Sequence, residues 1–136
     1  MLLVKTYVGP SAVEGVGVFA AEPVAPGAVI WRFDPRFDLL ISEAVYRGAD
    51  PVLQALLERH AYPSPDRPGL LVFEADNGRF MNHADDPNTD FSGDSCGVAS
   101  RAIAVGEEIT CNYREFHEDF ELLPGPAEAP SAAGDD

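Results

Sequence analysis

The segment from residue 79 to residue 113 constrains the fold most, because it places two polar clusters at the ends of one strand-like stretch. The first cluster reads Arg-Phe-Met-Asn-His-Ala-Asp-Asp-Pro-Asn (79–88) and the second reads Gly-Glu-Glu-Ile-Thr-Cys-Asn-Tyr (106–113). Asn82 and His83 follow an apolar pair and precede a loop that contains a proline. Polar side chains on loops held by strands are where functional sites tend to lie. We therefore expect this segment to contribute to a site.

Short apolar runs separated by Gly and Pro predict a compact, mainly β fold. The expected strands are 2–8, 15–20, 28–33, 70–74, 89–92 and 98–103. Residues 19–30 and 98–109 also align with each other, with Gly27 opposite Gly106, and predict two similar strand–turn–strand hairpins. Four matched positions are too few to separate an internal repeat from chance.

The middle of the chain predicts two helices. Ser42 is a suitable N-cap for a short helix ending at Gly48, and Asp50 with Pro51 begins a second helix that ends at His60. Four apolar residues of the second helix fall on one face: Val52, Leu53, Leu56 and Leu57. This pattern predicts that the second helix lies on the core.

Beyond the helices, Asp76-Asn77-Gly78 predicts a tight turn, because Asn and Gly tolerate positive φ. Residues 114–122 predict a further short helix. From residue 124 the chain is mostly Ala, Pro, Gly and acidic residues, which predicts a disordered tail at 124–136. We expect a single domain over residues 1–123.

The charge balance limits the classes of partner. The chain has 9 basic and 23 acidic residues and a formal net charge of −14. Nucleic-acid binding relies on clustered Lys and Arg, so direct binding of nucleic acid is not expected. The charge favours basic partners, although it would also serve solubility alone. We find no signal peptide and no membrane-spanning run, and expect a cytoplasmic protein without membrane contact.

Metal binding is not indicated by the spacing of the candidate ligands. Three side chains occupy the first ligand positions of an EF-hand-like calcium loop: Asp86, Asn88 and Asp90. However, Phe91 stands where Gly is required and Gly97 stands where the bidentate Glu should be. The histidines and cysteines lack the spacing of a zinc site: His83, Cys96, Cys111 and His117.

Two further features have a structural explanation when taken alone. Gly15-Val16-Gly17 at a strand entrance would let a ligand approach the backbone, or would simply form a turn. It lacks the third glycine of a dinucleotide site. Cys111 lies in a strand-like alternation, so we expect it to pack inward rather than act as a nucleophile.

Taken together and in order, three motifs resemble the SET domain of protein-lysine methyltransferases. They are Gly-x-Gly at 15–17, the cluster at 79–88, and Ala-Val-Gly-Glu-Glu-Ile-Thr-Cys-Asn-Tyr at 104–113. The family signatures look like G-x-G-x-F/A, R-F-x-N-H-S-x-x-P-N and G-E-E-[IL]-T-x-[DN]-Y. The resemblance covers about residues 2–120. It implies a mainly β fold of the β-clip (SET) type, with several short sheets, a pseudo-knotted C-terminal segment and a small helical insert at about 38–70.

The resemblance also implies S-adenosylmethionine as cofactor and a set of residues around it: Glu14, Gly15, Val16, Gly17, Asn82, His83, Tyr113 and Phe116. The backbone of the first four would follow the methionine part, while Asn82 and His83 would hold the amino group and the adenine. Tyr113 would be the catalytic residue, where the cofactor meets the lysine channel. Phe116 or Phe120 would supply an aromatic lid.

The chain departs from the family signature in the loop that follows His83. Ala84 replaces the usual Ser, and Asp85 replaces a Cys that joins a zinc cluster in many members. In the third motif, Asn112 in place of Asp is a milder change, because the signature admits both. Zinc is therefore not implied. With an ordinary pKa near ~10, Tyr113 is a poor general base at neutral pH, so we assign it orientation and electrostatic support.

The implied activity is S-adenosylmethionine-dependent protein-lysine N-methylation of a basic protein tail, histone-like or ribosomal. One alternative is a non-catalytic SET-like module that binds basic peptides, and another is a structural β domain. A minimal domain of this kind would also have reason to form a homodimer, which would complete its substrate groove.

Overall fold

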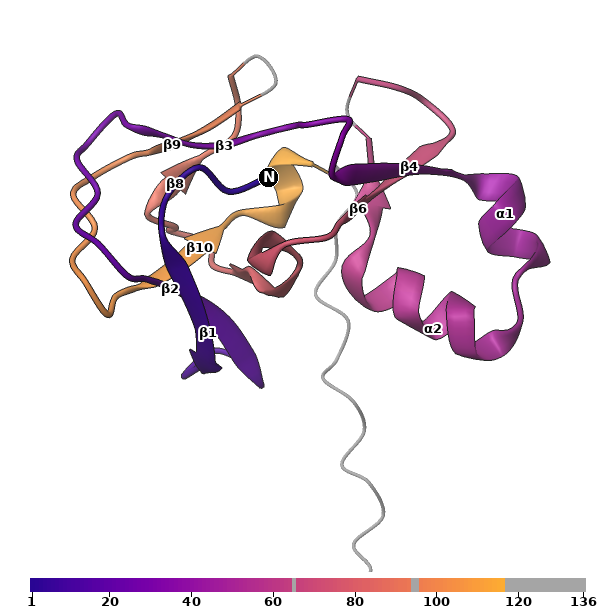
Figure 1. Ribbon diagram of the computed structural model, residues 1–136, viewed down its shortest axis with the longest axis horizontal. Coiled ribbons are helices and arrows are strands. Elements are labelled where there is room, and N and C mark those ends of the chain that lie inside the picture. Colours follow the sequence, from indigo (N-terminus) through magenta and orange to yellow (C-terminus); the bar gives the residue numbers. More distant parts are fainter. Residues whose placement is uncertain (65, 94–95, 117–136) are drawn as a thin grey trace, which may run out of the picture.

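The computed structural model describes residues 1–64, 66–93 and 96–116. These residues form three small sheets and a helical insert (Figure 1). The four-stranded sheet has the order β1 (Thr6–Pro10), β2 (Val16–Ala20), β10 (Glu108–Cys111) and β7 (Asn82–His83). The second sheet has the order β3 (Val29–Arg32), β9 (Cys96–Ala99) and β8 (Thr89–Asp90). The third has the order β4 (Asp38–Ser42), β6 (Leu70–Glu74) and β5 (Tyr62–Pro63).

The helical elements are short and lie mainly in the insert. They are α1 (Glu43–Gly48), α2 (Pro51–His60) and the 3₁₀ helices η1 (Asn77–Phe80) and η2 (Tyr113–Glu115). In the described ranges, no helix reaches the length and apolar character that a bilayer crossing demands. The prediction of a mainly β fold with a small helical insert is confirmed.

The two aligned stretches, 19–30 and 98–109, do not form hairpins. Instead β2 pairs antiparallel with β10 and β3 pairs antiparallel with β9, so each strand of one stretch pairs with the other stretch. An antiparallel bridge between Val24 and Ile103 lies between these two pairings. The hairpin prediction was wrong because each turn leads the chain from one sheet into another, which separates the strands it connects.

The two turns nevertheless match each other in detail. Gly27 and Gly106 have φ of 79° and 83°, which is the left-handed region that glycine adopts without strain. Gly27 N donates to Ala99 O at 2.7 Å, and the corresponding Gly106 N donates to Ala20 O at 2.8 Å. The repeat is therefore present in the structure as two cross-paired arms.

The core lies where these arms meet. Its largest fully buried apolar side chains are Val18, Ile30, Ile103 and Ile109. Val18 and Ile109 face each other across the β2–β10 pair, which places the centre of the core directly under β10. Core packing therefore holds β10, the strand that carries the second polar cluster, in place.

Asn88 is a buried polar residue beside this core, at 2% exposure. Its Nδ2 donates to Glu108 O at 2.8 Å, and its Oδ1 accepts from Thr110 N at 3.0 Å. The side-chain amide thus satisfies two backbone groups of β10, as a neighbouring strand would. Asn88 therefore holds β10 against the loop that begins at Asn82.

Both predicted caps of the insert helices are confirmed. The Ser42 side chain accepts from Val45 N in α1, and the Asp50 side chain accepts from Leu53 N in α2. Figure 1 shows α1 and α2 beside β4 and β6, on the opposite side of the molecule from β1, β2 and β3. The insert is thus a lateral extension of the fold.

The predicted packing of α2 was wrong. Only Leu57 is buried, at 8% exposure, whereas Val52, Leu53 and Leu56 are 79%, 49% and 44% exposed. The helix contacts β6 and the short helix α1, and these neighbours leave most of its apolar face exposed. An amphipathic pattern reports that a helix has an apolar face, and the area available to bury that face depends on the neighbouring elements.

The remaining differences concern turns and ends. Residues 77–80 form η1, capped by the Asp76 side chain, and Gly78 does not have the positive φ that we predicted. A Cβ on Gly78 would lie 2.8 Å from Glu74 Oε1, so close packing requires this glycine. The strand predicted at 2–8 lies at Thr6–Pro10, where Pro10 is tolerated because β1 is an edge strand.

Of the helix predicted at 114–122, the structure describes only residues 114–116, and residues 114 and 115 belong to the 3₁₀ helix η2. Residues 117–122 lie outside the described residues. The predicted tail at 124–136 lies outside the described residues.

Candidate functional site

The Asn82 amide lies where β2, β7 and β10 come together, and four oxygen atoms surround it. Its Nδ2 is 3.1 Å from Ser11 Oγ, 3.2 Å from Glu14 O, 3.0 Å from Val16 O and 3.0 Å from Glu108 Oε2. An amide nitrogen has only two N–H groups to donate. Acceptors therefore outnumber donors here, which is an arrangement that suits a cationic ligand group.

The two glycines of the Gly-x-Gly motif have different reasons to be glycine. Gly15 has φ of 47°, in the left-handed region. A Cβ on Gly17 would lie 2.4 Å from Glu108 Oε2, so Gly17 makes room for this carboxylate. The sequence alone left two roles open for this motif, close approach of a ligand to the backbone or a simple turn. The structure shows that Gly17 admits Glu108 beside Asn82.

Sequence reasoning missed Ser11 and did not separate the two glutamates of the third motif. Ser11 Oγ is 2.6 Å and 2.9 Å from the two Glu108 carboxylate oxygens, so it holds this carboxylate toward Asn82. Glu107 instead accepts from Ala104 N at 2.9 Å and closes the turn. Alternation along a strand gives neighbouring residues opposite faces, which was the available signal.

His83 and Tyr113 meet just beyond the end of β10. Tyr113 N donates to His83 Nδ1 at 3.0 Å, and the two ring centroids are 5.2 Å apart. His83 Nε2 lies 2.8 Å from Asp85 Oδ1, and Arg114 NH1 lies 2.8 Å from the same oxygen. The end of the first polar cluster is thus tied to the end of the second.

The Tyr113 phenol points back to the same segment, because its hydroxyl donates to Met81 O. Burial raises the pKa of Tyr113 well above its ordinary value, and the nearby Cys111, Glu14 and Glu108 act in the same direction. The phenol is therefore neutral at physiological pH.

Phe116 lies in an aromatic cluster rather than alone. Its ring centroid is 5.2 Å from that of Tyr62 and 4.9 Å from that of Phe91, which in turn is 5.8 Å from Trp31. Phe120, the other candidate for the aromatic lid, is outside the described residues, as is His117. The rings of this aromatic cluster therefore connect the insert strand β5 to the residue that follows η2.

Comparison with known proteins identifies the family. The family model of the SET domain matches residues 15–114. The chain belongs to the SET-domain family. The comparison with curated protein sequences found no match.

Solved structures similar to this SET domain include proteins of two organisms. A Plasmodium falciparum protein, provisionally assigned as a histone methyltransferase, is 21% identical with a TM-score of 0.57, over 82% of this chain and 95% of that chain. Chaetomium thermophilum Polycomb Repressive Complex 2 in an autoinhibited state, without ligand, is 22% identical with a TM-score of 0.63, over 83% of this chain and 16% of that chain. The same complex bound to S-adenosylmethionine is 23% identical with a TM-score of 0.60, over 84% of this chain and 16% of that chain.

These likenesses establish the fold, and the β-clip (SET) class is confirmed. The chain spans nearly the whole Plasmodium protein but about one sixth of the Chaetomium chain.

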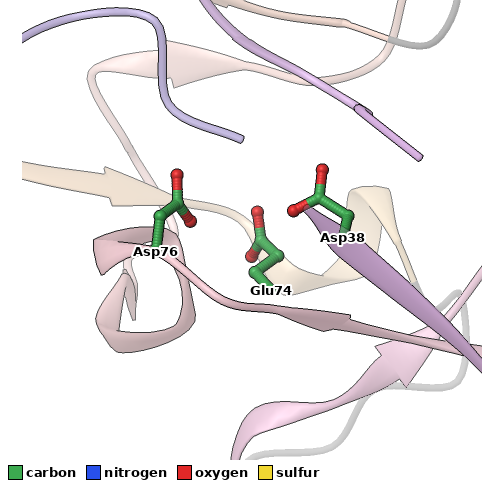
Figure 2. Close-up of side chains that lie close together, drawn as sticks. All are labelled: Asp38, Glu74 and Asp76. Atoms are coloured by element: carbon green, nitrogen blue, oxygen red, sulfur yellow. The ribbon is translucent and has the colours of Figure 1, made fainter. Parts of the chain in front are cut away.

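A second polar group in this SET domain was not predicted: three carboxylates gathered at the base of the insert. Asp38 of β4, Glu74 of β6 and Asp76 before η1 have oxygens within 4.8 Å of one another (Figure 2). Met1 N lies 2.9 Å from Asp38 Oδ2 and 3.9 Å from Glu74 Oε1, and Trp31 Nε1 donates to Glu74. Burial raises the pKa of Glu74 to about 7. The ammonium and the indole N–H partner the two buried acids, Asp38 and Glu74, and Asp76 accepts from Leu2 N at 2.6 Å, so the group has a structural explanation.

No spacing rule could have found this carboxylate group, because Asp38 is far in sequence from Glu74 and Asp76. Among the residues that the structure describes, it is also the only set of His, Cys, Asp or Glu side chains close enough to hold a metal ion. His83 and Cys111 do not belong to such a set in that part of the chain.

Proposed function

We propose that this SET domain is an S-adenosylmethionine-dependent protein-lysine N-methyltransferase that acts on a basic protein tail, histone-like or ribosomal. One observation carries the proposal: the three motifs meet at one place. The Asn82 amide contacts the backbone oxygens of Glu14 and Val16, and the His83 ring contacts the backbone of Tyr113. Family membership and the similarity to methyltransferase structures support the same activity.

The acceptor atoms around Asn82 suit the cofactor. The methionine part of S-adenosylmethionine carries an ammonium group, and the four oxygens around Asn82 include a carboxylate, from Glu108, that would favour this charge. The backbone of residues 14–17 would lie along the methionine part, and His83, Tyr113 and Phe116 would complete the site. When bound, the cofactor supplies an electrophilic methyl group for in-line displacement by an amine.

The main obstacle to the reaction is the proton on the substrate lysine. Its ordinary pKa is ~10.4, so only about one lysine in two thousand is neutral at pH 7. A narrow channel with apolar and aromatic walls lowers this pKa by removing water from the ammonium. Tyr62, Phe91 and Phe116 offer such walls in this chain.

Tyr113 orients the amine rather than taking its proton. Its raised pKa makes the phenolate too costly to form at neutral pH. Its proton is donated to Met81 O, so the phenol presents oxygen lone pairs to the reacting amine. The expected contribution is alignment and electrostatic support, which can supply a large part of the rate of such a displacement.

Charge supports the choice of substrate class. A net charge of −14 attracts basic segments and continues to attract them after methylation, because the methylated lysine keeps its positive charge. One of the similar Chaetomium complexes contains H3K27me3 and H3K27M, which is consistent with a histone-like tail. We further propose a cytoplasmic protein that forms no direct contact with nucleic acid or membrane and that can complete its substrate groove as a homodimer.

The test is methyl transfer from labelled S-adenosylmethionine to a mixture of basic proteins. We expect the wild type to label lysine and both Tyr113→Ala and Tyr113→Phe to bind cofactor but lose most of the transfer. Asn82→Ala should weaken cofactor binding itself, measured by calorimetry, whereas Asn77→Ala, outside the site, should not. Normal turnover by Tyr113→Ala would refute its assignment. Cofactor binding by the wild type without transfer would favour the alternative, a non-catalytic module that binds basic peptides.

A further inference from the structure

We propose that Asp85 is a positioning residue for Tyr113, acting through His83 and held in place by Arg114. This inference rests on the proposed methyltransferase function, and it concerns a position where the chain departs from the family signature. We call the three linked side chains of Asp85, His83 and Arg114 the strap. The strap joins the loop after β7 to the segment that carries Tyr113.

The strap begins where the backbone pairing ends. β7 and β10 are parallel, with Asn82 opposite Thr110 and His83 opposite Cys111. Ala84 N then donates to Cys111 O at 2.9 Å. After Cys111 the chain turns into η2, and the first N–H groups of a helix have no partner within the helix. The Tyr113 N–H therefore needs a partner outside the helix, and a side chain can supply it.

His83 satisfies the Tyr113 backbone, and this contact requires one particular tautomer of the ring. Tyr113 N donates to Nδ1 at 3.0 Å, so Nδ1 is the acceptor and the ring proton is on Nε2. The Nε2–H faces Asp85 Oδ1 at 2.8 Å. An ionised carboxylate can only accept, so Asp85 selects the tautomer that Tyr113 needs. The His83 side chain is only 8% exposed, which confines the ring to this orientation.

Arg114 closes the strap from the opposite direction. Its NH1 lies 2.8 Å from the same Asp85 oxygen, and Arg114 directly follows Tyr113 in the chain. The hydrogen bonds from His83 and from Arg114 both lower the pKa of Asp85, which keeps it ionised. Asp85 is thus held by the segment whose position it controls.

Tyr113 is consequently held at two points by one short segment. Its backbone N–H is bound to His83, and its hydroxyl donates to Met81 O. Movement of the His83 ring would shift the phenol relative to Met81 and hence relative to the reacting amine. A displacement of an aligning group by about 1 Å can reduce the rate of a reaction that depends on alignment by about 10²-fold. Asp85 itself touches neither reacting group, so its influence is on position.

The experiment combines imidazole ¹⁵N NMR with steady-state kinetics on the full chain. In the wild type we expect His83 to show a protonated Nε2 and an acceptor Nδ1. Asp85→Ala should mix the tautomers and lower kcat by about 10- to 100-fold, with little change in the KM for S-adenosylmethionine. Asp85→Asn should recover most of kcat, because its Oδ1 still accepts from Nε2–H. Arg114→Ala should cause a smaller loss than Asp85→Ala.

Asp86→Ala is the matched control, because Asp86 is the exposed neighbour in the same loop and loses the same charge. An unchanged tautomer in Asp85→Ala would overturn the proposal. So would equal kcat values for Asp85→Ala and Asp86→Ala. A wild-type chain that transfers no methyl group would refute the proposed function instead, and the NMR spectra would still decide whether Asp85 sets the tautomer.

Discussion

Replacing Asn88 by alanine should destabilise the fold severely, although Asn88 belongs to a motif of a cofactor-binding family. The side chain is 2% exposed, and its amide forms one hydrogen bond to Glu108 O and one from Thr110 N. Alanine removes both partners at once. The buried Glu108 carbonyl and Thr110 N–H of β10 then lose the side-chain groups that take the place of water as their hydrogen-bond partners.

The magnitude follows from these two groups. Leaving a buried donor or acceptor unsatisfied costs about 1–3 kcal/mol, so Asn88→Ala should reduce the free energy of unfolding by about 2–6 kcal/mol. A domain of this kind has about 5–15 kcal/mol in total. Asn88→Asp should be no better, because it retains the acceptor for Thr110 N but turns a second oxygen toward the Glu108 carbonyl.

Urea unfolding, followed by the fluorescence of Trp31, measures this loss directly. Trp31 is the only tryptophan and is 8% exposed, so its emission reports on the core. Asn77→Ala is the control, because Asn77 donates one hydrogen bond, to Thr6 Oγ1, and should lose about 1 kcal/mol. A loss below about 1 kcal/mol in Asn88→Ala, with weakened cofactor binding, would refute the structural role and make Asn88 a ligand-binding residue.

Three further predictions test other parts of the structure. Gly17→Ala should weaken cofactor binding and stability, because the new Cβ would displace the Glu108 carboxylate, and calorimetry with urea unfolding measures both effects. Leu57→Ala should lower the free energy of unfolding by about 2–5 kcal/mol, whereas Leu53→Ala on the exposed face should lower it by less than about 1 kcal/mol. Equal losses in urea unfolding would show that both leucines of α2 are buried. Burial raises the pKa of Glu74 to about 7, so the stability it contributes is complete below its ordinary value of 4.5 and is lost as the pH rises toward 7. The free energy of unfolding should fall by up to about 3 kcal/mol over this range. Urea unfolding at pH 5 and pH 7 should show this fall in the wild type but not in Glu74→Gln. An equal fall in both proteins would contradict the prediction.

The sequence was informative wherever a local rule decides the structure. The caps at Ser42 and Asp50 follow from residue type alone, and both are observed. The strand at residues 70–74 has the predicted bounds, because its apolar run ends at turn residues. The three motifs also indicated which segments would meet, through their order and their resemblance to a family.

The sequence was uninformative wherever partners distant in the chain decide. The same strand–turn–strand pattern is compatible with hairpins and with the observed cross-pairing of β2 with β10. The apolar pattern of α2 could not show how little surface would be available to cover Leu53 and Leu56. The contact of Asp38 with Glu74 depends on the pairing of β4 with β6, which no spacing in the sequence reports.

The motif residues in this SET domain mostly hold one another, and this determines how substitutions should be interpreted. Gly17 admits Glu108, Glu108 faces Asn82, and Asn88 fixes the β10 backbone that carries Glu108. Loss of activity after changing any of these residues would therefore show that the site had moved, without showing which group takes part in the reaction. Tyr113→Phe is a smaller change, because it removes one oxygen with its hydrogen bond to Met81 O and leaves the backbone contact to His83 in place. A Tyr113→Phe protein that binds S-adenosylmethionine normally, unfolds at the wild-type urea concentration and transfers little methyl would locate the chemistry at that hydroxyl.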